Sequence, residues 1–386
     1  MAKRAHTDAA MLEALRRHNG VRHLAAQELG IHPRVLLKHL ARMKRRGIEV
    51  PESAYNEDRA GYWGGHFPAP AGHVVKGVST LYDEHGNIRA QWVKSDAARK
   101  GPEEWAQAIK EVFADATPVR RIPRPKTMQR ETLTVYPIGD HHVAMYSWGE
   151  ETGADYDIKI AENLLTSAAA HLVEIAPPSE RALIANVGDF FHVDNLKNET
   201  SRSGNTLDVD TRYAAMIRAG VRMLRTFIER ALAKHRTVEV ICAIGNHDDV
   251  GAMWLSLALS LLYEKNPRVV VHTTPGKFHY VRHGQVLIGV THGDTVRLEQ
   301  LGAVMAADRP QEWGQTRHRY WLTGHIHQRR VIELPGVLVE SFRTLAARDA
   351  YATSAGYRSG RDMMAIVFHA EHGEVARHRF DVGMLQ

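Results

Sequence analysis

Cysteine and long apolar runs are what this 386-residue sequence most clearly lacks. Cys242 is the single cysteine, which excludes an internal disulfide and a Cys-rich zinc module and suits a reducing compartment. No stretch approaches the roughly 18 uninterrupted apolar residues of a membrane-spanning helix, and no apolar signal core follows the N-terminus. Hydrophobic residues nevertheless make up 44% of the chain, enough to bury cores. We therefore expect a folded cytoplasmic protein of two or three domains that does not enter a membrane.

Net charge is distributed unevenly along the chain. The total is +6, but residues 1–46 carry 11 Lys and Arg residues against 3 acidic residues, a net charge of +8. The remaining residues are therefore slightly acidic, with a net charge of −2. Long-range attraction of a polyanion is expected from the N-terminal segment rather than from the rest of the chain.

The basic N-terminal segment contains apolar residues at helical spacing in three short stretches. Gly30 ends the second stretch where a helix-turn-helix makes its tight turn, and Pro33 suits the first turn of a third helix. The exposed side of that helix would present six basic residues: Arg34, Lys38, Arg42, Lys44, Arg45 and Arg46. We expect Arg34, Lys38 and Arg42 to contact DNA. Residues 22–40 resemble the helix-turn-helix family of DNA-binding domains, which implies that the third helix lies in the major groove and that a homodimer is one expected arrangement. The alternative is a three-helix protein-interaction module with a solvated basic face.

Residues 48–130 form a region of different composition. Apolar residues alternate on both sides of the Gly-containing loop 83–87, which predicts a β-hairpin. A helix over about 102–113 follows, and then a linker rich in proline and arginine. We therefore expect three parts: a helix-turn-helix over 1–47, this small region over 48–130 and a larger domain over 131–386.

Strand-like apolar runs alternate with amphipathic helices from residue 132 onward. The expected helices lie near 156–175, 207–234 and 253–263. The strand-like runs are 132–138, 182–187, 238–244, 286–291, 320–323, 331–340 and 364–368. This alternation predicts a layered α/β domain with its active residues at the ends of strands.

Five of these strands are followed by a cluster of polar residues of metal-binding type. The clusters are Gly-Asp-His-His at 139–142, Gly-Asp-Phe-Phe-His at 188–192, Gly-Asn-His-Asp at 245–248, His-Gly-Asp at 292–294 and Gly-His-Ile-His at 324–327. Each alone is a weak signal, because a single histidine beside a strand is usually structural. All five in this order resemble the successive motifs of the calcineurin-like metallophosphoesterase superfamily. The resemblance implies a β-sandwich flanked by helices.

The same resemblance implies a centre with two divalent metal ions, which polarise a phosphoryl oxygen and generate hydroxide. Mn²⁺ is the expected ion, with Fe, Zn²⁺ and Mg²⁺ as alternatives. The implied ligands are Asp140, His142 and His327 for one metal, Asn246, His292 and His325 for the other, and Asp189 as a bridge between them.

Further residues around the implied ligands receive separate interpretations. The resemblance implies that His247 is not a ligand but donates to the charge that develops on the phosphate, with Asp248 holding its imidazole. His141 lies between two ligands and is interpreted as structural. His192 follows the bridging aspartate as in the second motif of SbcD-type DNA-repair exonucleases, which implies a contact with the nucleic-acid strand. The alternative for His192 is a hydrogen bond to a metal ligand.

The sequence therefore favours a metal-dependent phosphodiesterase that acts on DNA, an exonuclease or endonuclease delivered by the helix-turn-helix. The combination looks like proteins of bacteria and their phages. Two alternatives stay open. One is a small-molecule phosphodiesterase or phosphomonoesterase tethered to DNA or to a partner, and the other is a DNA-binding regulator with an inactive phosphoesterase fold. The presence of all seven implied ligands argues against inactivity.

Overall fold

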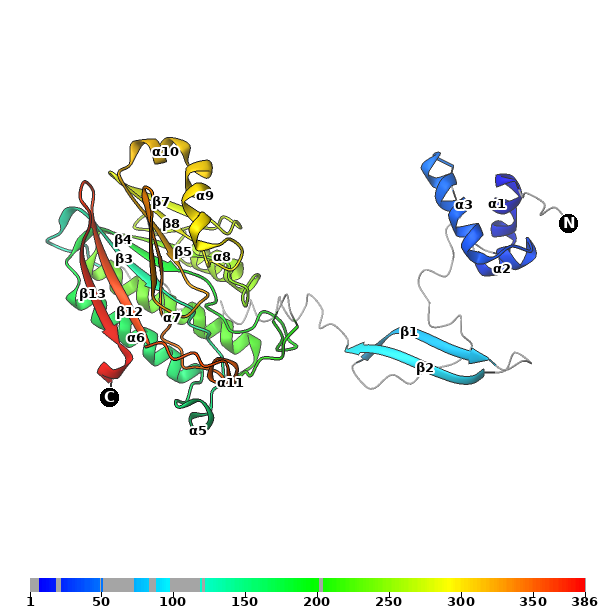
Figure 1. Ribbon diagram of the computed structural model, residues 1–386, viewed down its shortest axis with the longest axis horizontal. Coiled ribbons are helices and arrows are strands. Elements are labelled where there is room, and N and C mark those ends of the chain that lie inside the picture. The colour runs from blue at the N-terminus through cyan, green and yellow to red at the C-terminus, as the bar shows by residue number, and fades with distance from the viewer. Residues whose placement is uncertain are drawn as a thin grey trace. The chain divides into compact units, whose positions relative to one another are not determined.

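A computed structural model of the protein describes residues 7–18, 22–48, 50, 73–82, 88–97, 119, 122–200 and 204–385. The chain divides into two compact units, residues 1–105 and 106–386, and Figure 1 labels the elements of each. The helix expected over 102–113 lies outside the described residues.

Three short helices begin the first unit: α1 (Asp8–Arg17), α2 (Arg22–Glu28) and α3 (Pro33–Arg45). The Thr7 hydroxyl caps α1 by accepting the backbone N–H of Ala10. Gly30 adopts φ 62° in the turn between α2 and α3, a conformation that favours glycine. Apolar residues of all three helices, including Leu15 and Leu36, are buried in one core. The expected three-helix arrangement is confirmed.

The expected hairpin forms from β1 (His73–Tyr82) and β2 (Ile88–Ala97), which pair in antiparallel orientation. His73 lies opposite Ala97 and Tyr82 lies opposite Ile88, so residues 83–87 connect the two strands.

The described part of the second unit contains two β-sheets. One has the strand order β13-β12-β3-β4-β5-β6 and the other has the order β10-β11-β9-β8-β7. Neighbours among β3 to β6 are parallel, as are β8 with β9 and β9 with β11. The strands are β3 (Gln129–Ile138), β4 (Ser179–Asn186), β5 (Thr237–Cys242), β6 (Val269–Val271), β7 (His279–His283), β8 (Val286–Val290), β9 (His318–Thr323), β10 (Arg330–Leu334), β11 (Val337–Ser341), β12 (Asp362–His369) and β13 (Gly373–Asp381).

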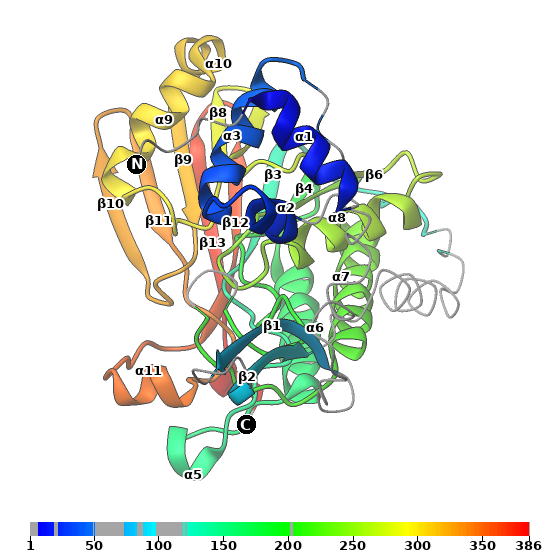
Figure 2. The same cartoon turned by 90° about the vertical axis from the view of Figure 1, so that its right-hand side faces the viewer.

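The two sheets share a buried apolar core. Leu133 and Ile241 of the larger sheet belong to the same cluster as Ile288 and Leu322 of the smaller sheet. The larger sheet also contacts three helices, and Figure 2 shows two of them, α6 and α7, side by side. These helices are α6 (Ile158–Ile175), α7 (Tyr213–Lys234) and α8 (Gly251–Leu262). The expected layered α/β sandwich is therefore present.

Some elements differ from the sequence-based expectation. The single strand expected over 331–340 is two strands, β10 and β11, because the chain turns at Pro335 and Gly336, where Gly336 has φ 80°. Helix α7 begins later than residue 207, since the backbone N–H groups of Leu207 and Asp210 bond to loop carbonyls instead. The strands β6, β7 and β13 were not expected. Within the parts of the chain that the structure describes, no helix has the length and apolar character to cross a membrane.

Candidate metal centre

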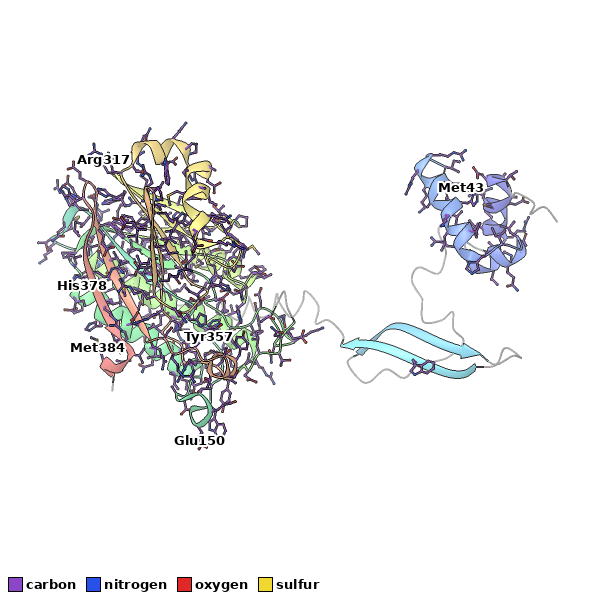
Figure 3. The ribbon with its side chains drawn as sticks, in the orientation of Figure 1. Met43, Glu150, Arg317, Tyr357, His378 and Met384 are labelled. Atoms are coloured by element: carbon purple, nitrogen blue, oxygen red, sulfur yellow. The ribbon has the colours of Figure 1, made fainter. Side chains whose placement is uncertain are left out.

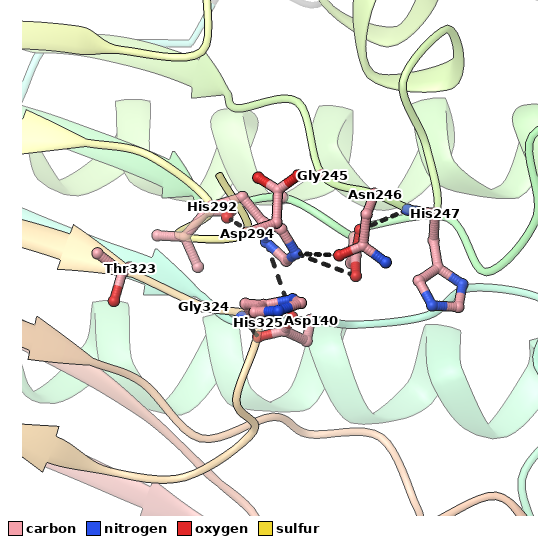
Figure 4. A network of polar contacts seen from close by, with 12 residues as sticks. Asp140, Gly245, Asn246, His247, His292, Asp294, Thr323, Gly324 and His325 are labelled. Carbon is pink, nitrogen blue, oxygen red and sulfur yellow. Dashed lines mark hydrogen bonds and ion pairs between the residues drawn. The ribbon is translucent and has the colours of Figure 1, made fainter. Parts of the chain in front are cut away.

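The five polar clusters begin at the carboxyl ends of β3, β4, β5, β8 and β9. Because β3, β4 and β5 are parallel neighbours in one sheet and β8 and β9 are parallel neighbours in the other, each sheet gathers its clusters at one edge. Packing of the two sheets brings these edges together, and Figure 4 shows Asp140, Asn246, His292 and His325 meeting there.

The backbone is strained at the expected ligands. Seven non-glycine residues in the described part of the chain have positive φ, and five of them are expected ligands. These five are Asp140 (35°), His142 (47°), Asp189 (50°), His325 (70°) and His327 (50°). Each such conformation costs about 1–3 kcal/mol and persists only where the surroundings hold it, typically at functional sites. The strain marks these turns as the part of the fold shaped by a ligand-binding requirement.

Glycines lie beside the expected ligands, and because they have no side chain they leave room for those ligands. A Cβ added at Gly324 would lie 2.6 Å from Asp140 Oδ2. A Cβ added at Gly188, which has φ 100°, would lie 2.6 Å from His292 Nδ1. A side chain at either position would therefore displace a ligand.

Asp140, His142 and His327 form the first group of ligand atoms, which lie within 4.8 Å of one another. His142 Nε2 is 3.2 Å from His327 Nε2, which in turn is 3.5 Å from Asp140 Oδ1. The Asp140 carboxylate is fully buried and also accepts the backbone N–H of His325 at 2.8 Å. Burial opposes charge on His327, yet the carboxylate raises the pKa of this imidazole overall. A buried anion facing two imidazole nitrogens suits a divalent cation.

The second group contains Asp189, His292 and His325, and Asn246 adjoins it. His292 Nδ1 donates to the Val187 carbonyl at 3.0 Å, because a carbonyl can only accept. The other ring nitrogen, Nε2, then faces Asn246 Oδ1 and Asp189 Oδ2, each at 3.1 Å. Burial disfavours a charged imidazole, but the Asp189 carboxylate raises the pKa of His292 to about 10.

These contacts show that positive charge is favoured where the electron-rich atoms converge. A proton on His292 Nε2 could satisfy two oxygens only partly, whereas a divalent cation accepts a nitrogen and several oxygens at once. The residues therefore fit divalent metal ions. The two groups adjoin, since Asp140 Oδ1 lies 3.9 Å from His292 Nδ1. The bridging role of Asp189 stays a prediction.

His247 lies beside both groups without belonging to the expected ligands. Its backbone N–H donates to Asp189 Oδ1 at 2.9 Å, and its Nδ1 donates to the His192 carbonyl at 2.9 Å. The Nδ1 proton is therefore fixed, and Nε2 is left for a bound molecule. His247 lines a cleft of about 590 Å³ together with His142, Asp189 and His327.

Asp248 does not hold the imidazole of His247, so this expectation is wrong. Its buried carboxylate accepts four backbone N–H groups that belong to the loops after β4 and β5. The donors are Asp189 (3.2 Å), Phe190 (2.9 Å), Phe191 (3.2 Å) and Gly245 (3.0 Å). The imidazole of His247 instead donates to the His192 carbonyl. Asp248 thus joins the two loops that carry Asp189 and Asn246.

His192 is buried, and its contacts agree with the alternative interpretation of a hydrogen bond to a ligand. Its Nδ1 lies 3.2 Å from His142 Nδ1, and its ring stacks on His247 with 5.4 Å between centroids. Burial lowers the pKa of His192 to about 3, so the ring is neutral at pH 7. His141 is structural as expected: it is fully buried and its Nε2 donates to the Ala161 carbonyl at 3.0 Å.

Comparison with known proteins gives a family match at the N-terminus of the chain. The family model described as bacterial regulatory protein, Fis family, matches residues 9–43. The N-terminal module is a helix-turn-helix. No curated protein sequence matches the chain.

Several solved structures are similar to this chain at low identity. An uncharacterized Streptococcus pneumoniae protein described as a predicted phosphoesterase is 10% identical over 66% of this chain and 99% of its own, with a TM-score of 0.27. Vps29 of Entamoeba histolytica, crystallised with Zn²⁺, is 16% identical over 64% and 98%, with a TM-score of 0.29. The 5′-nucleotidase of Candida albicans is 9% identical over 68% and 54%, with a TM-score of 0.32.

The motif order, the two packed sheets and the converging groups of expected ligands agree with the resemblance to the calcineurin-like metallophosphoesterases. The chain joins a Fis-type helix-turn-helix to a two-sheet α/β fold in which these side chains converge.

The helix-turn-helix places two of its three expected DNA-contacting residues on an exposed surface. Lys38 and Arg42 are exposed on α3, while Leu36 and Leu40 of the same helix are buried. Arg34 belongs to α3, but its side chain lies outside the described residues.

Sequence reasoning missed one wall of the cleft in the second unit. The segment between β11 and β12 contributes to the lining, and it contains α11 (Ala350–Ser354). Its lining residues include Arg348, Tyr351, Tyr357 and Arg361. The available signal was the frequency of arginine and tyrosine between two strands, which alone is typical of many surface loops.

Proposed function

We propose that this protein is a two-metal-dependent phosphodiesterase that hydrolyses DNA, directed to its substrate by the helix-turn-helix. The observation that supports the chemistry is the convergence of carboxylate, imidazole and amide ligands on one cleft. Divalent cations bound there would polarise a phosphoryl oxygen and lower the pKa of a water molecule.

The chain itself supplies the ligands and the contacts that orient them. We assign Asp140, His142 and His327 to one cation, Asn246, His292 and His325 to the other, and Asp189 to both. The Val187 carbonyl keeps a proton on His292 Nδ1, so that Nε2 faces the site and would supply its lone pair to a cation that displaces the Nε2 proton. Asp248 holds the backbone of both ligand-bearing loops in place.

His247 is the proposed proton donor. Since Nδ1 donates to the His192 carbonyl, the orientation of the ring is fixed before substrate binds. A proton on Nε2 would then be positioned to stabilise a phosphate oxygen or to protonate the leaving oxygen.

The helix-turn-helix supports DNA as the substrate. Lys38 and Arg42 extend from α3, the helix that enters the major groove in this class of domain. The surrounding segment carries a net charge of +8, which favours association with a polyanion. DNA in the cytoplasm is therefore the proposed target.

Cleavage of labelled single-stranded and double-stranded DNA in Mn²⁺ tests this proposal. His247→Ala should slow cleavage by about 10²–10⁴-fold, as expected when a general acid is removed. Asp189→Asn should abolish it, because the amide removes a buried anion from the metal centre. His378→Ala on β13, labelled in Figure 3, is the matched control and should leave the rate unchanged.

Hydrolysis of bis(p-nitrophenyl) phosphate by the same proteins separates the alternatives. If the wild type hydrolyses this aryl diester but no DNA, the nuclease proposal is rejected in favour of a small-molecule phosphodiesterase. If it hydrolyses neither and binds no metal, the regulator with an inactive fold is favoured.

A further inference from the structure

Two arginines in the wall beside α11 carry charge that no carboxylate of the described residues neutralises. Arg348 donates to the carbonyls of Tyr357 (3.2 Å) and Thr152 (2.9 Å). Arg361 donates twice to the Leu345 carbonyl, at 3.0 and 2.8 Å. Within the same described part of the chain neither arginine forms an ion pair, and both line the cleft that contains the metal ligands.

The two guanidinium groups also influence each other. Burial lowers the pKa of Arg361, and the positive charge of Arg348 lowers it further. The acidic neighbour Asp349 is already engaged, because its carboxylate caps α11 by accepting the backbone N–H of Ala352 at 2.7 Å. Two guanidinium groups that form no ion pair with a carboxylate of the described residues attract an anion, and guanidinium groups match the geometry of phosphate.

The same wall exposes two aromatic rings. Tyr351 is 71% exposed and Tyr357 is 45% exposed, although both line the cleft. Their ring centroids are 6.5 Å apart with an interplanar angle of 68°. The backbone N–H of Tyr357 donates to the Ala352 carbonyl at 2.9 Å, so the second ring is carried on a hydrogen-bonded turn. Exposed aromatic rings beside basic groups are the combination that binds unpaired nucleic-acid strands.

We propose that this wall binds single-stranded nucleic acid next to the phosphodiester that is cleaved. A base stacks on Tyr351 or Tyr357, and Arg348 and Arg361 contact a neighbouring phosphate. A base within a duplex has both faces covered by its neighbours, so the aromatic rings select an unpaired strand or a frayed end. This inference names the substrate class of the site and rests on the proposed function.

Fluorescence of a single-stranded hexanucleotide that contains 2-aminopurine tests the inference on the full-length protein in Ca²⁺. Stacking on tyrosine should quench the probe. The double variant Tyr351→Ala/Tyr357→Ala should remove the quenching and weaken binding by about tenfold, since stacking contributes about 1–3 kcal/mol per base. The double Phe variant, which keeps both rings, should behave as wild type.

The arginines are tested with the same strand. Arg348→Gln should weaken binding and reduce the slope of log affinity against log salt concentration by about 0.7, the value for one phosphate that is no longer neutralised. Arg317→Gln is the matched control, because Arg317 is exposed and Figure 3 places it well away from Tyr357. A short single strand also avoids the helix-turn-helix, which reads duplex DNA.

Equal quenching and equal affinity of wild type and the double Ala variant would overturn the inference. Hydrolysis of bis(p-nitrophenyl) phosphate by the wild type distinguishes failure of this inference from failure of the proposed function. An active wild type with unaffected Tyr variants refutes only the strand-binding wall, whereas an inactive wild type refutes the phosphodiesterase.

Discussion

Asp248→Asn replaces one oxygen by an amide nitrogen at the point where two ligand-bearing loops meet. In the wild type, Oδ1 accepts the backbone N–H groups of Asp189 and Gly245, and Oδ2 accepts those of Phe190 and Phe191. The asparagine keeps one accepting oxygen and turns an NH₂ group toward two other donors. Two hydrogen bonds are therefore removed while the volume of the side chain is unchanged.

The size of the effect follows from those two hydrogen bonds. A hydrogen bond to a charged group contributes about 1.5–3 kcal/mol, so the free energy of unfolding should fall by about 3–6 kcal/mol. A decrease of 1 kcal/mol lowers Tm by about 2–4 °C in a domain of this size, and a fall of at least about 6 °C is expected. Burial, and then the nearby Asp189, raise the pKa of Asp248, so measurement at pH 9 keeps the carboxylate charged.

Thermal unfolding of the metal-free protein measures the effect, and metal content measures its consequence for the site. Glu333→Gln is the matched control, because it makes the same chemical change at an exposed position on β10 and surface substitutions of this kind change stability by only about 0.5 kcal/mol. A wild-type Tm and full metal content in Asp248→Asn would refute the idea that Asp248 holds the two loops.

Three further predictions concern other parts of the molecule. His192→Ala should reduce metal affinity by about 10–100-fold in a calorimetric titration, because His142 loses the imidazole beside its Nδ1; unchanged affinity would remove His192 from the site. Burial lowers the pKa of His235 from its ordinary value of 6.5 to about 4. The contribution of His235 to the free energy of unfolding should therefore fall by about 1.4 kcal/mol per pH unit from pH 6.5 toward pH 4. Urea unfolding of His235→Gln should show a pH dependence from which this contribution is missing. The double variant Lys38→Ala/Arg42→Ala should lower the salt slope of duplex binding by about 2, and an unchanged slope would favour a protein-interaction module.

The location of the candidate metal centre could be predicted because it depends on local patterns. Each cluster follows an apolar strand, and parallel strands end at the same edge of a sheet, so Asp140, Asp189 and Asn246 had to lie near one another. The turn at Pro335 and Gly336 was overlooked because apolar residues continue on both sides of it.

The role of Asp248 and the wall beside α11 could not be predicted in the same way. Asp248 contacts Phe190, which is 58 residues away along the chain, and no local spacing encodes that contact. Arg348 and Tyr351 belong to a segment with little regular structure, where arginine and tyrosine look like any solvated loop. Only the packing of that segment beside the proposed metal ligands brings these residues into one wall of the cleft.

Anomalous diffraction from a crystal grown in Mn²⁺ tests the central claim most directly. Two manganese peaks about 3.5–4 Å apart are expected, as in two-metal phosphoesterase sites. One peak should lie among Asp140, His142 and His327, and the other among Asn246, His292 and His325. A single peak, no peak, or peaks elsewhere in the molecule would contradict the two-metal centre.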